Sequence, residues 1–285
     1  MSEVGSEFNP TKPPLGRRII DKAAKPFFPQ EVVHASADGL RKATEFVQNG
    51  GGLIVAFTHL SGREGPDVII WLAGQPVFNT RRVVSPVSHH TYYRSKLSEL
   101  AYKTEAKIAG IELKPVVTPE TQSLAGNNSN IVPSQGLKDY LETAGEALSK
   151  RGVVPVALQA AGNLGKLGDP TPALSALVET TKSKFPQCKL GVLFVGLEFP
   201  ESEGENVSMK GADDVSKMHI GRRIQLKIGD FLTAEEAQKA AEGDESPLTL
   251  TSEGKKIRRL DSWAFKQLAS LLSPRNVDSR YLPQK

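Results

Sequence analysis

Short apolar runs alternate with segments of helical period along most of this chain, and this alternation limits the folds that the chain can adopt. The runs end at polar or glycine-rich loops, which is typical of strands buried on both faces. The predicted strands are Leu53–Phe57, Arg81–Val87, Ile111–Val117, Val153–Leu158, Leu190–Phe199 and Ile224–Ile228, the last of which alternates apolar and polar residues. Because strands that alternate with helices form parallel units, the sequence predicts an α/β fold with a mostly parallel central sheet flanked by helices.

The helices between these runs are predicted from apolar positions that recur on one face. They span Asp38–Gln48, Asp67–Ala73, Ser95–Ala109, Gln135–Lys150, Pro172–Lys184, Thr233–Ala241 and Lys255–Leu272. Residues 1–14 contain three prolines and no hydrophobic period, so we expect a flexible lead-in there. Residues 15–285 are expected to form a single domain.

The segment Leu15–Phe28 has the pattern of an amphipathic helix at the start of this domain. Its apolar residues share one face, and its basic residues, Arg17, Arg18, Lys22 and Lys25, occupy the other. We expect this helix to pack on the domain with its basic face in solvent; the alternative is a helix on a membrane surface. A second basic cluster, at residues 255–259, has the same two interpretations.

Composition excludes several classes of protein. The hydrophobic fraction of 39% and the charged fraction of 24% are ordinary for a soluble globular protein. No apolar run is long enough to span a membrane, and the polar start of the chain does not resemble a signal peptide, so we expect a cytoplasmic protein. A net charge of +4 with 6% aromatic residues argues against nucleic-acid binding. A single cysteine, Cys188, excludes an intramolecular disulfide and a multi-thiolate metal site.

The strongest candidate for chemistry lies in the polar loop that follows the run Leu53–Phe57. This loop carries His59, Ser61 and Glu64 before the next helix begins. A histidine that removes a proton from an alcohol needs a carboxylate on its other ring nitrogen, which fixes the tautomer and stabilises the imidazolium. Glu64 can reach His59 across a turn, and Asp67 is the alternative partner.

A second loop, QAAGNLGKLGDP, follows the run Val153–Leu158. Ligands of open α/β sheets bind beyond the carboxyl ends of the strands. The loops after Phe57 and Leu158 are therefore the two candidate binding loops, and we expect them to face one another. The histidines of the chain lack the spacing of metal ligands, so no metal site is predicted.

The residues around His59, AFTHLSGREGPDVIIWLAG, resemble the first signature block of the glycerolipid acyltransferases, in which Asn-His-x-Ser-x-x-Asp ends a strand and opens a helix. Thr58 stands for the Asn and Glu64 for the Asp. GIELKPVV and VVPVALQAAGNLGKLG follow in the order of the next two family blocks, with Val116, Ala161 and Leu164 where that family has Arg, Glu and Arg. IQLKIGDFLTAEEAQ and WAFKQLASLLSPRNVDSRY resemble its last segments, so the similarity extends over most of the chain after residue 37.

The resemblance implies an O-acyltransferase in which His59 is the general base and Glu64 orients it. The donor would be acyl-CoA or acyl carrier protein, the acceptor a hydroxyl of a glycerol-phosphate or a lysophospholipid, and no other cofactor is implied. A peripheral place on the inner face of a membrane is also implied. The expected substrate-binding residues are Ser61, Arg63, Arg94, Lys114, Gly162, Asn163 and Lys166.

Two other functions stay open at this point. The first is a relative of the same fold that binds a lipid or an acyl carrier protein without turnover, which Ala161 and Leu164 suggest. The second is a hydrolase with Ser61 as nucleophile and His59 as base. The hydrolase is disfavoured because Ser61 lacks the Gly-x-Ser-x-Gly elbow that exposes such a nucleophile.

Overall fold

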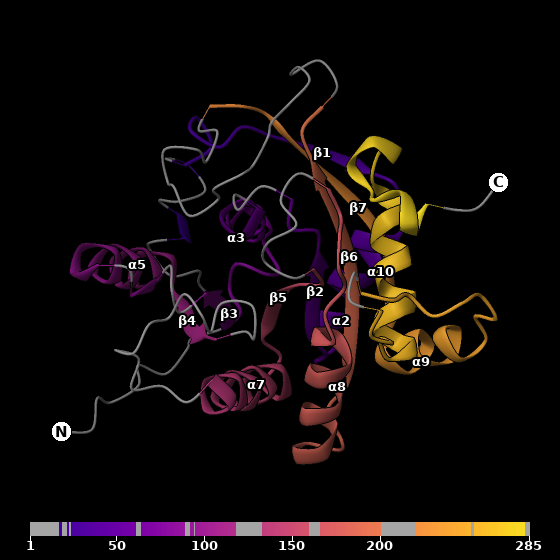
Figure 1. Ribbon diagram of the computed structural model, residues 1–285. Helices are drawn as coiled ribbons and strands as arrows, with labels where there is room; N and C mark the ends of the chain where they lie inside the picture. Colours follow the sequence, from indigo (N-terminus) through magenta and orange to yellow (C-terminus); the bar gives the residue numbers. More distant parts are fainter. Residues whose placement is uncertain are drawn as a thin grey trace.

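One mixed sheet of seven strands forms the centre of the protein (Figure 1). The structure, a computed structural model, describes residues 17–18, 22, 24–60, 64–88, 92–93, 95–117, 133–159, 166–200, 221–251 and 254–282. The strands are Gln30–His34 (β1), Gly52–Phe57 (β2), Val83–Ser88 (β3), Ile111–Val116 (β4), Val153–Ala157 (β5), Leu190–Glu198 (β6) and Ile224–Thr233 (β7). Their order across the sheet is β1-β7-β6-β2-β5-β3-β4.

The directions of the strands confirm the predicted α/β fold with a mostly parallel sheet. The strands β6, β2, β5, β3 and β4 run parallel to one another, whereas β7 is antiparallel to β6 and β1 is parallel to β7. The sequence contains no apolar run that predicts a strand at β1. This strand lies at the edge of the sheet, and its side chains are exposed or half-buried, so it carries no continuous apolar run.

Helices cover both faces of the sheet (Figure 1). The described helices of more than one turn are Gly39–Gln48 (α2), Glu64–Gly74 (α3), Lys96–Ala109 (α5), Pro133–Ser149 (α7), Ala173–Lys184 (α8), Ala234–Glu242 (α9) and Arg259–Leu271 (α10). Side chains of α7, α8, α9 and α10 pack with Ile54 and Ala56 of β2. Side chains of α2 and α3 pack with Leu53 and Val55 of the same strand. Because neighbouring strand residues point to opposite faces, these two clusters lie on opposite sides of the sheet.

Two helices begin three or more residues away from the predicted start. The helix α3 begins at Glu64 rather than at Asp67, and α10 begins at Arg259 rather than at Lys255. The residues before α10 pair with an earlier segment: Lys256 forms a bridge with Leu250, and the Ile257 amide donates to the Thr249 carbonyl. These contacts replace the helical hydrogen bonds that the apolar period predicted.

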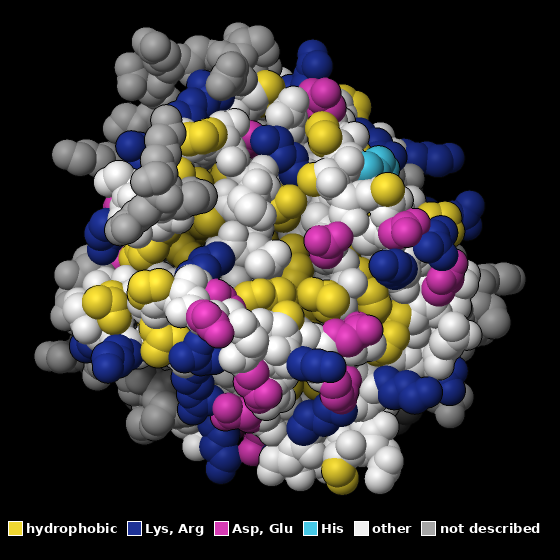
Figure 2. All heavy atoms as spheres, turned by 90° about the vertical axis from the view of Figure 1, so that its right-hand side faces the viewer, with side chains coloured by type: hydrophobic (Ala, Val, Ile, Leu, Met, Phe, Trp, Pro, Cys, Tyr) yellow, Lys and Arg dark blue, Asp and Glu magenta, His cyan; other side chains and the backbone are white. Residues whose placement is uncertain are grey.

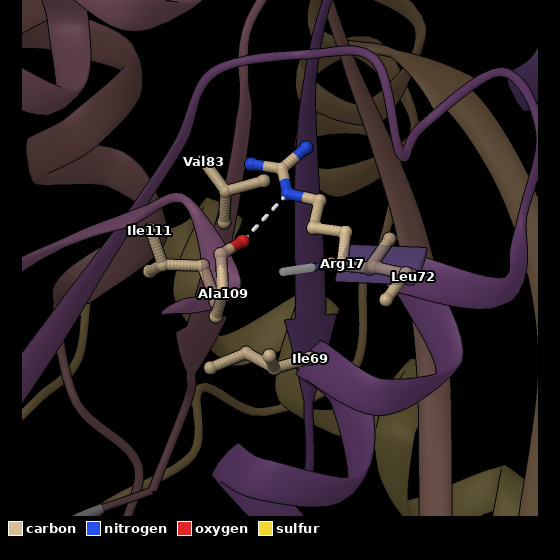
Figure 3. Close-up of a pocket in the computed structure, with 7 residues that line it drawn as sticks. Arg17, Ile69, Leu72, Val83, Ala109 and Ile111 are labelled. Carbon is tan, nitrogen blue, oxygen red and sulfur yellow. Dashed lines mark hydrogen bonds between the residues drawn. The ribbon is translucent and has the colours of Figure 1, made fainter. Parts of the chain in front are cut away.

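The N-terminal segment differs from the predicted amphipathic helix in its basic face. Arg17, Arg18 and Lys22 are helical, but residues 24–28 form a turn. Arg18 and Lys22 are exposed as expected, whereas Arg17 is only 2% exposed. Its guanidinium lies at a small pocket between α3 and the β3 and β4 strands and donates to the Ala109 carbonyl (Figure 3). The apolar lining of this pocket comes from Ile69, Leu72, Ala73, Val83, Ala109 and Ile111.

The second basic cluster, at residues 255–259, is partly held by local contacts. Arg258 forms an ion pair with Glu179 of α8, and Arg259 donates to the Asp244 carbonyl. Basic and acidic side chains are interspersed on the face of the molecule drawn in Figure 2. This arrangement fits the interpretation of a solvated face. None of the helices in the described part of the chain has both the length and the apolar composition needed to cross a bilayer.

Candidate functional site

The two candidate loops begin side by side at the carboxyl ends of β2 and β5. Phe57, the last residue of β2, is in register with Ala157 of β5 on one side and with Val195 of β6 on the other. The Leu158 amide donates to the Phe57 carbonyl at 3.3 Å. The start of each loop is therefore placed as the sequence predicted, although residues 160–165 of the second loop lie outside the described residues.

His59 in the first loop forms a pair with Glu64, the first residue of α3. His59 Nδ1 lies 3.3 Å from Glu64 Oε2, and the Leu60 amide donates to Glu64 Oε1 at 2.9 Å. Glu64 is 1% exposed and His59 is 26% exposed. An ionised carboxylate can only accept, so this contact is a hydrogen bond in the tautomer that carries the proton on Nδ1, and in that tautomer the other ring nitrogen, Nε2, keeps its lone pair. The pair has the geometry of a base and its orienting carboxylate.

Asp67, the alternative acid, has a different partner. It is fully buried, and its Oδ1 accepts a hydrogen bond of 3.0 Å from Gln30 Nε2. The same amide group also donates to the Asp67 carbonyl at 2.8 Å. Asp67 therefore joins the first turns of α3 to the edge strand β1, and Glu64 is the carboxylate that the structure places on His59.

Thr58 fixes the chain immediately before His59. Its side chain is fully buried, and Oγ1 both donates to the Leu197 carbonyl at 3.2 Å and accepts from the Leu197 amide at 2.8 Å. The hydroxyl thus continues the hydrogen bonding between β2 and β6 past the end of β2. This contact explains why a residue with a short polar side chain stands at this position.

Thr58→Val is expected to lower the free energy of unfolding by about 1–3 kcal/mol, because the valine leaves two buried backbone groups of Leu197 without partners. Urea unfolding followed by circular dichroism measures the change. Thr58→Ser is the matched control, since it keeps the hydroxyl, and it should lose less stability than Thr58→Val. Equal stability of Thr58→Val and the wild type would show that these two hydrogen bonds contribute nothing.

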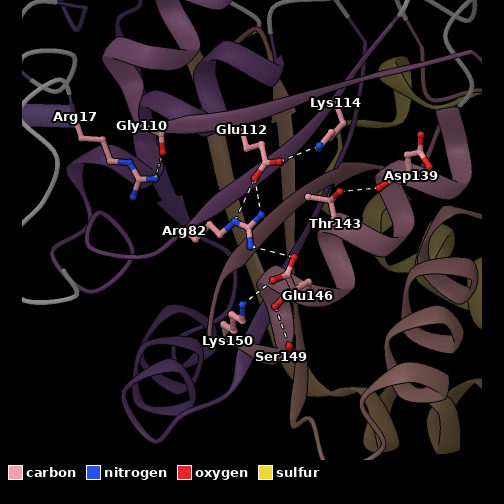
Figure 4. Close-up of polar contacts among 10 residues, drawn as sticks. All are labelled: Arg17, Arg82, Gly110, Glu112, Lys114, Asp139, Thr143, Glu146, Ser149 and Lys150. Carbon is pink, nitrogen blue, oxygen red and sulfur yellow. Dashed lines mark hydrogen bonds and ion pairs between the residues drawn. The ribbon is translucent and has the colours of Figure 1, made fainter. Parts of the chain in front are cut away.

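Lys114 lies away from this loop. Its Nζ is 3.0 Å from Glu112 Oε1, and Glu112 also pairs with Arg82 (Figure 4). Burial opposes the ionisation of Glu112, but hydrogen bonds from Arg82 and Lys114 outweigh it and lower the pKa of this carboxyl. Three strand spacings, about 14 Å, separate β4 from β2. The structure therefore does not bring Lys114, predicted to bind substrate, to His59; it belongs to a network of ion pairs beside α7.

Of the other predicted binding residues, only Lys166 falls within the described part of the chain. Ser61, Arg63, Arg94, Gly162 and Asn163 lie outside the described residues. The Lys166 side chain is exposed, and its carbonyl accepts a hydrogen bond from Gln159 Nε2. Lys166 precedes Leu167, which packs in one cluster with Leu60. This lysine therefore precedes a residue that packs near the first loop, and it stays a candidate for binding an anionic group of a substrate.

An apolar cluster that includes the residue after His59 was not predicted from the sequence. Leu60, the residue after His59, is 5% exposed and packs with Leu167, Phe265, Leu272 and Val277. These side chains come from both candidate loops, from α10 and from the segment after it. Their only signal in the sequence is that each is apolar, which does not distinguish them from the rest of the core.

The arrangement can perform acid–base chemistry on a substrate beyond the end of β2. The imidazole is oriented by a buried carboxylate and its side chain is 26% exposed, which are two requirements for a base that acts on a substrate hydroxyl. Within the described residues, no group of three or more His, Cys, Asp or Glu side chains is arranged to hold a metal ion. Comparison with protein-family models and with curated proteins gave no match to this chain.

Proposed function

We propose that this protein is an acyltransferase that moves a fatty acyl group from an acyl thioester, acyl-CoA or acyl carrier protein, to a hydroxyl of a glycerol-phosphate or lysophospholipid acceptor. The observation that carries the proposal is the pair of His59 and Glu64 at the carboxyl end of a parallel strand, 3.3 Å apart. The order of the sequence blocks around this pair supports the substrate class. A peripheral place on the inner face of a membrane, where such acceptors lie, belongs to the same proposal.

The proposed reaction needs one base and no redox step. His59 Nε2 takes the proton of the acceptor hydroxyl while the oxygen attacks the thioester carbonyl. The tetrahedral intermediate then collapses with cleavage of the carbon–sulfur bond, and the departing thiolate receives the proton from His59. Glu64 holds the ring and stabilises the imidazolium between the two proton transfers. The products are an ester and a free thiol.

Recognition of an acceptor phosphate falls to groups other than Lys114. Lys114 is paired with Glu112 and lies about three strand spacings from His59. The basic side chains that remain candidates for binding the phosphate are Lys166, Arg63 and Arg94. The backbone N–H groups of Gly162 and Asn163 are candidate hydrogen-bond donors to it. Binding energy from a remote phosphate would position the acceptor hydroxyl for attack.

The test is a thiol-release assay with long-chain acyl-CoA and acyl carrier protein as donors. The acceptors are glycerol-3-phosphate, lysophosphatidate and unphosphorylated alcohols, each compared with an analogue that lacks the reacting hydroxyl. We expect thiol release that depends on the hydroxyl, together with the matching ester in the mass spectrum. A preference for the phosphorylated acceptors would support phosphate recognition.

Two outcomes would overturn the proposal. Thiol release that is independent of acceptor indicates a hydrolase, and labelling of Ser61 by a fluorophosphonate would then identify the nucleophile. Binding of a donor without release of thiol, for every donor and acceptor, indicates a lipid- or acyl-carrier-binding relative without turnover.

A further inference from the structure

Two consecutive residues at the end of β6, Leu197 and Glu198, connect to the chain on either side of His59. Leu197 holds Thr58, the residue before His59, through the two hydrogen bonds of its backbone. Glu198 accepts hydrogen bonds from the segment that follows α10, and this segment shares an apolar cluster with Leu60, the residue after His59. Thr58 and Leu60 are both buried, and only His59 between them is partly exposed.

Glu198 is a buried carboxylate that accepts from four donor groups of three residues. Its side chain is 2% exposed and forms an ion pair with Lys227 of β7. The Ser273 amide and the Asn276 side-chain amide donate to Oε2 at 2.8 and 2.7 Å, and the Ser273 hydroxyl donates to Oε1 at 2.8 Å. Burial opposes ionisation, but these donors outweigh it and lower the pKa of Glu198. Three of the four contacts go to the residues after α10, which we call the C-terminal tail (residues 273–282).

The C-terminal tail in turn holds the loops of the candidate site. The Leu167 amide donates to the Asn276 carbonyl at 2.6 Å, and the Asp278 amide donates to the Leu167 carbonyl at 3.0 Å. Val277, between these two tail residues, packs in the apolar cluster with Leu60 and Leu167. The Leu60 amide donates to Glu64 Oε1, so a shift of Leu60 would move a contact that fixes the Glu64 carboxylate.

We propose that Glu198 is a positioning residue for the pair of His59 and Glu64. It acts by holding the C-terminal tail, which shares an apolar cluster with Leu60 and pairs with Leu167 and thereby fixes both loops of the site. The consequence for turnover depends on the acyltransferase function proposed above, whereas the positioning itself does not. A carboxylate suits this task because it accepts from several donors at once; a glutamine would place an amide donor against them.

The chain offers variants that separate positioning from stability. Asn276→Ala removes one contact between Glu198 and the tail, and Glu198→Gln weakens all of them. Lys227→Met is the matched control, because it removes the ion pair and lowers stability without removing a tail contact. Asn276 is half-buried, so its truncation should leave a folded protein even if Glu198→Gln does not fold.

The first measurement is hydrogen exchange of the peptide that contains Leu60, with the stability of each variant measured by urea unfolding. We expect exchange to become about tenfold faster in Asn276→Ala, the loss expected for one hydrogen bond to a charged group, at a rate above that predicted from its global stability. Lys227→Met should show only the change that its stability predicts. Unchanged exchange in Asn276→Ala, or a change equal to that of Lys227→Met at equal stability, would overturn the proposal.

The second measurement applies the thiol-release assay to the same variants. We expect kcat to fall about tenfold in Asn276→Ala while KM for the acyl donor stays close to the wild-type value, because the pair of His59 and Glu64 is displaced and donor contacts are not. If the wild-type protein shows no transfer activity, only the proposed function is overturned. The positioning role is decided independently by the hydrogen-exchange result.

Discussion

His59→Ala is expected to lose acceptor-dependent acyl transfer by about 10⁴- to 10⁶-fold, as is found when the histidine of a catalytic unit is removed. The reason is that His59 is the only proposed base, and its Nδ1 is already engaged by Glu64 at 3.3 Å. The measurement is the rate of thiol release with a saturating donor and the preferred acceptor. Since His59 is 26% exposed, its truncation should leave the free energy of unfolding nearly unchanged.

Glu64→Gln is the matched companion of this variant. Glutamine has nearly the same shape, but it can present its amide group to His59 and favour the tautomer in which Nε2 carries the proton. Loss of the orienting carboxylate in a comparable triad lowers kcat about 10⁴-fold, so we expect a loss close to, or somewhat smaller than, that of His59→Ala. Transfer at the wild-type rate by His59→Ala would contradict the assignment of the base. A fully active Glu64→Gln would restrict Glu64 to a structural role.

The strands in the middle of the sheet were predictable because strands that are buried on both faces consist mostly of apolar residues. β2 and β6 are buried at every position, so their sequences are continuous apolar runs that cannot be taken for loops. β1 has no continuous apolar run, because an edge strand has one neighbour and none of its side chains is fully buried. It becomes a strand through its pairing with β7, which begins nearly 200 residues later in the chain.

In the candidate site, too, contacts between residues close in sequence were predictable and contacts between distant residues were not. His59 and Glu64 are five residues apart, so a turn that leads into a helix is sufficient to pair them, and the sequence contains that information. The position of Lys114 depends on the order β2-β5-β3-β4, which no local pattern encodes. Glu198 contacts residues 75 and 78 positions away, and as one acidic residue after an apolar run it resembles any strand end.

Arg17 shows most clearly that a local pattern does not decide the surroundings of a charged side chain. Helical period placed it on a solvated face with Arg18, but its guanidinium is buried and donates only to backbone carbonyls in the contacts that the structure describes. Those carbonyls belong to Ala109 and Gly110 at the end of α5 and to the turn after α3. The C-terminal end of a helix carries a partial negative charge, which favours a cation there. Burial lowers the pKa of Arg17 to about 10, so the side chain is still charged at neutral pH.

Arg17→Met is therefore expected to lower the free energy of unfolding by about 2–4 kcal/mol, because methionine fills the space of the aliphatic stem but leaves buried carbonyls without a donor. The measurement is urea unfolding, in which the midpoint should fall with little change in the slope. Arg18→Met is the matched control: the neighbouring arginine is exposed, and its loss should change stability by less than about 0.5 kcal/mol. Equal effects of the two substitutions would mean that the Arg17 contacts do not stabilise the fold. A large effect of Arg17→Met alone would show that the N-terminal segment is part of the folded domain, because a single guanidinium joins it to the ends of both α3 and α5.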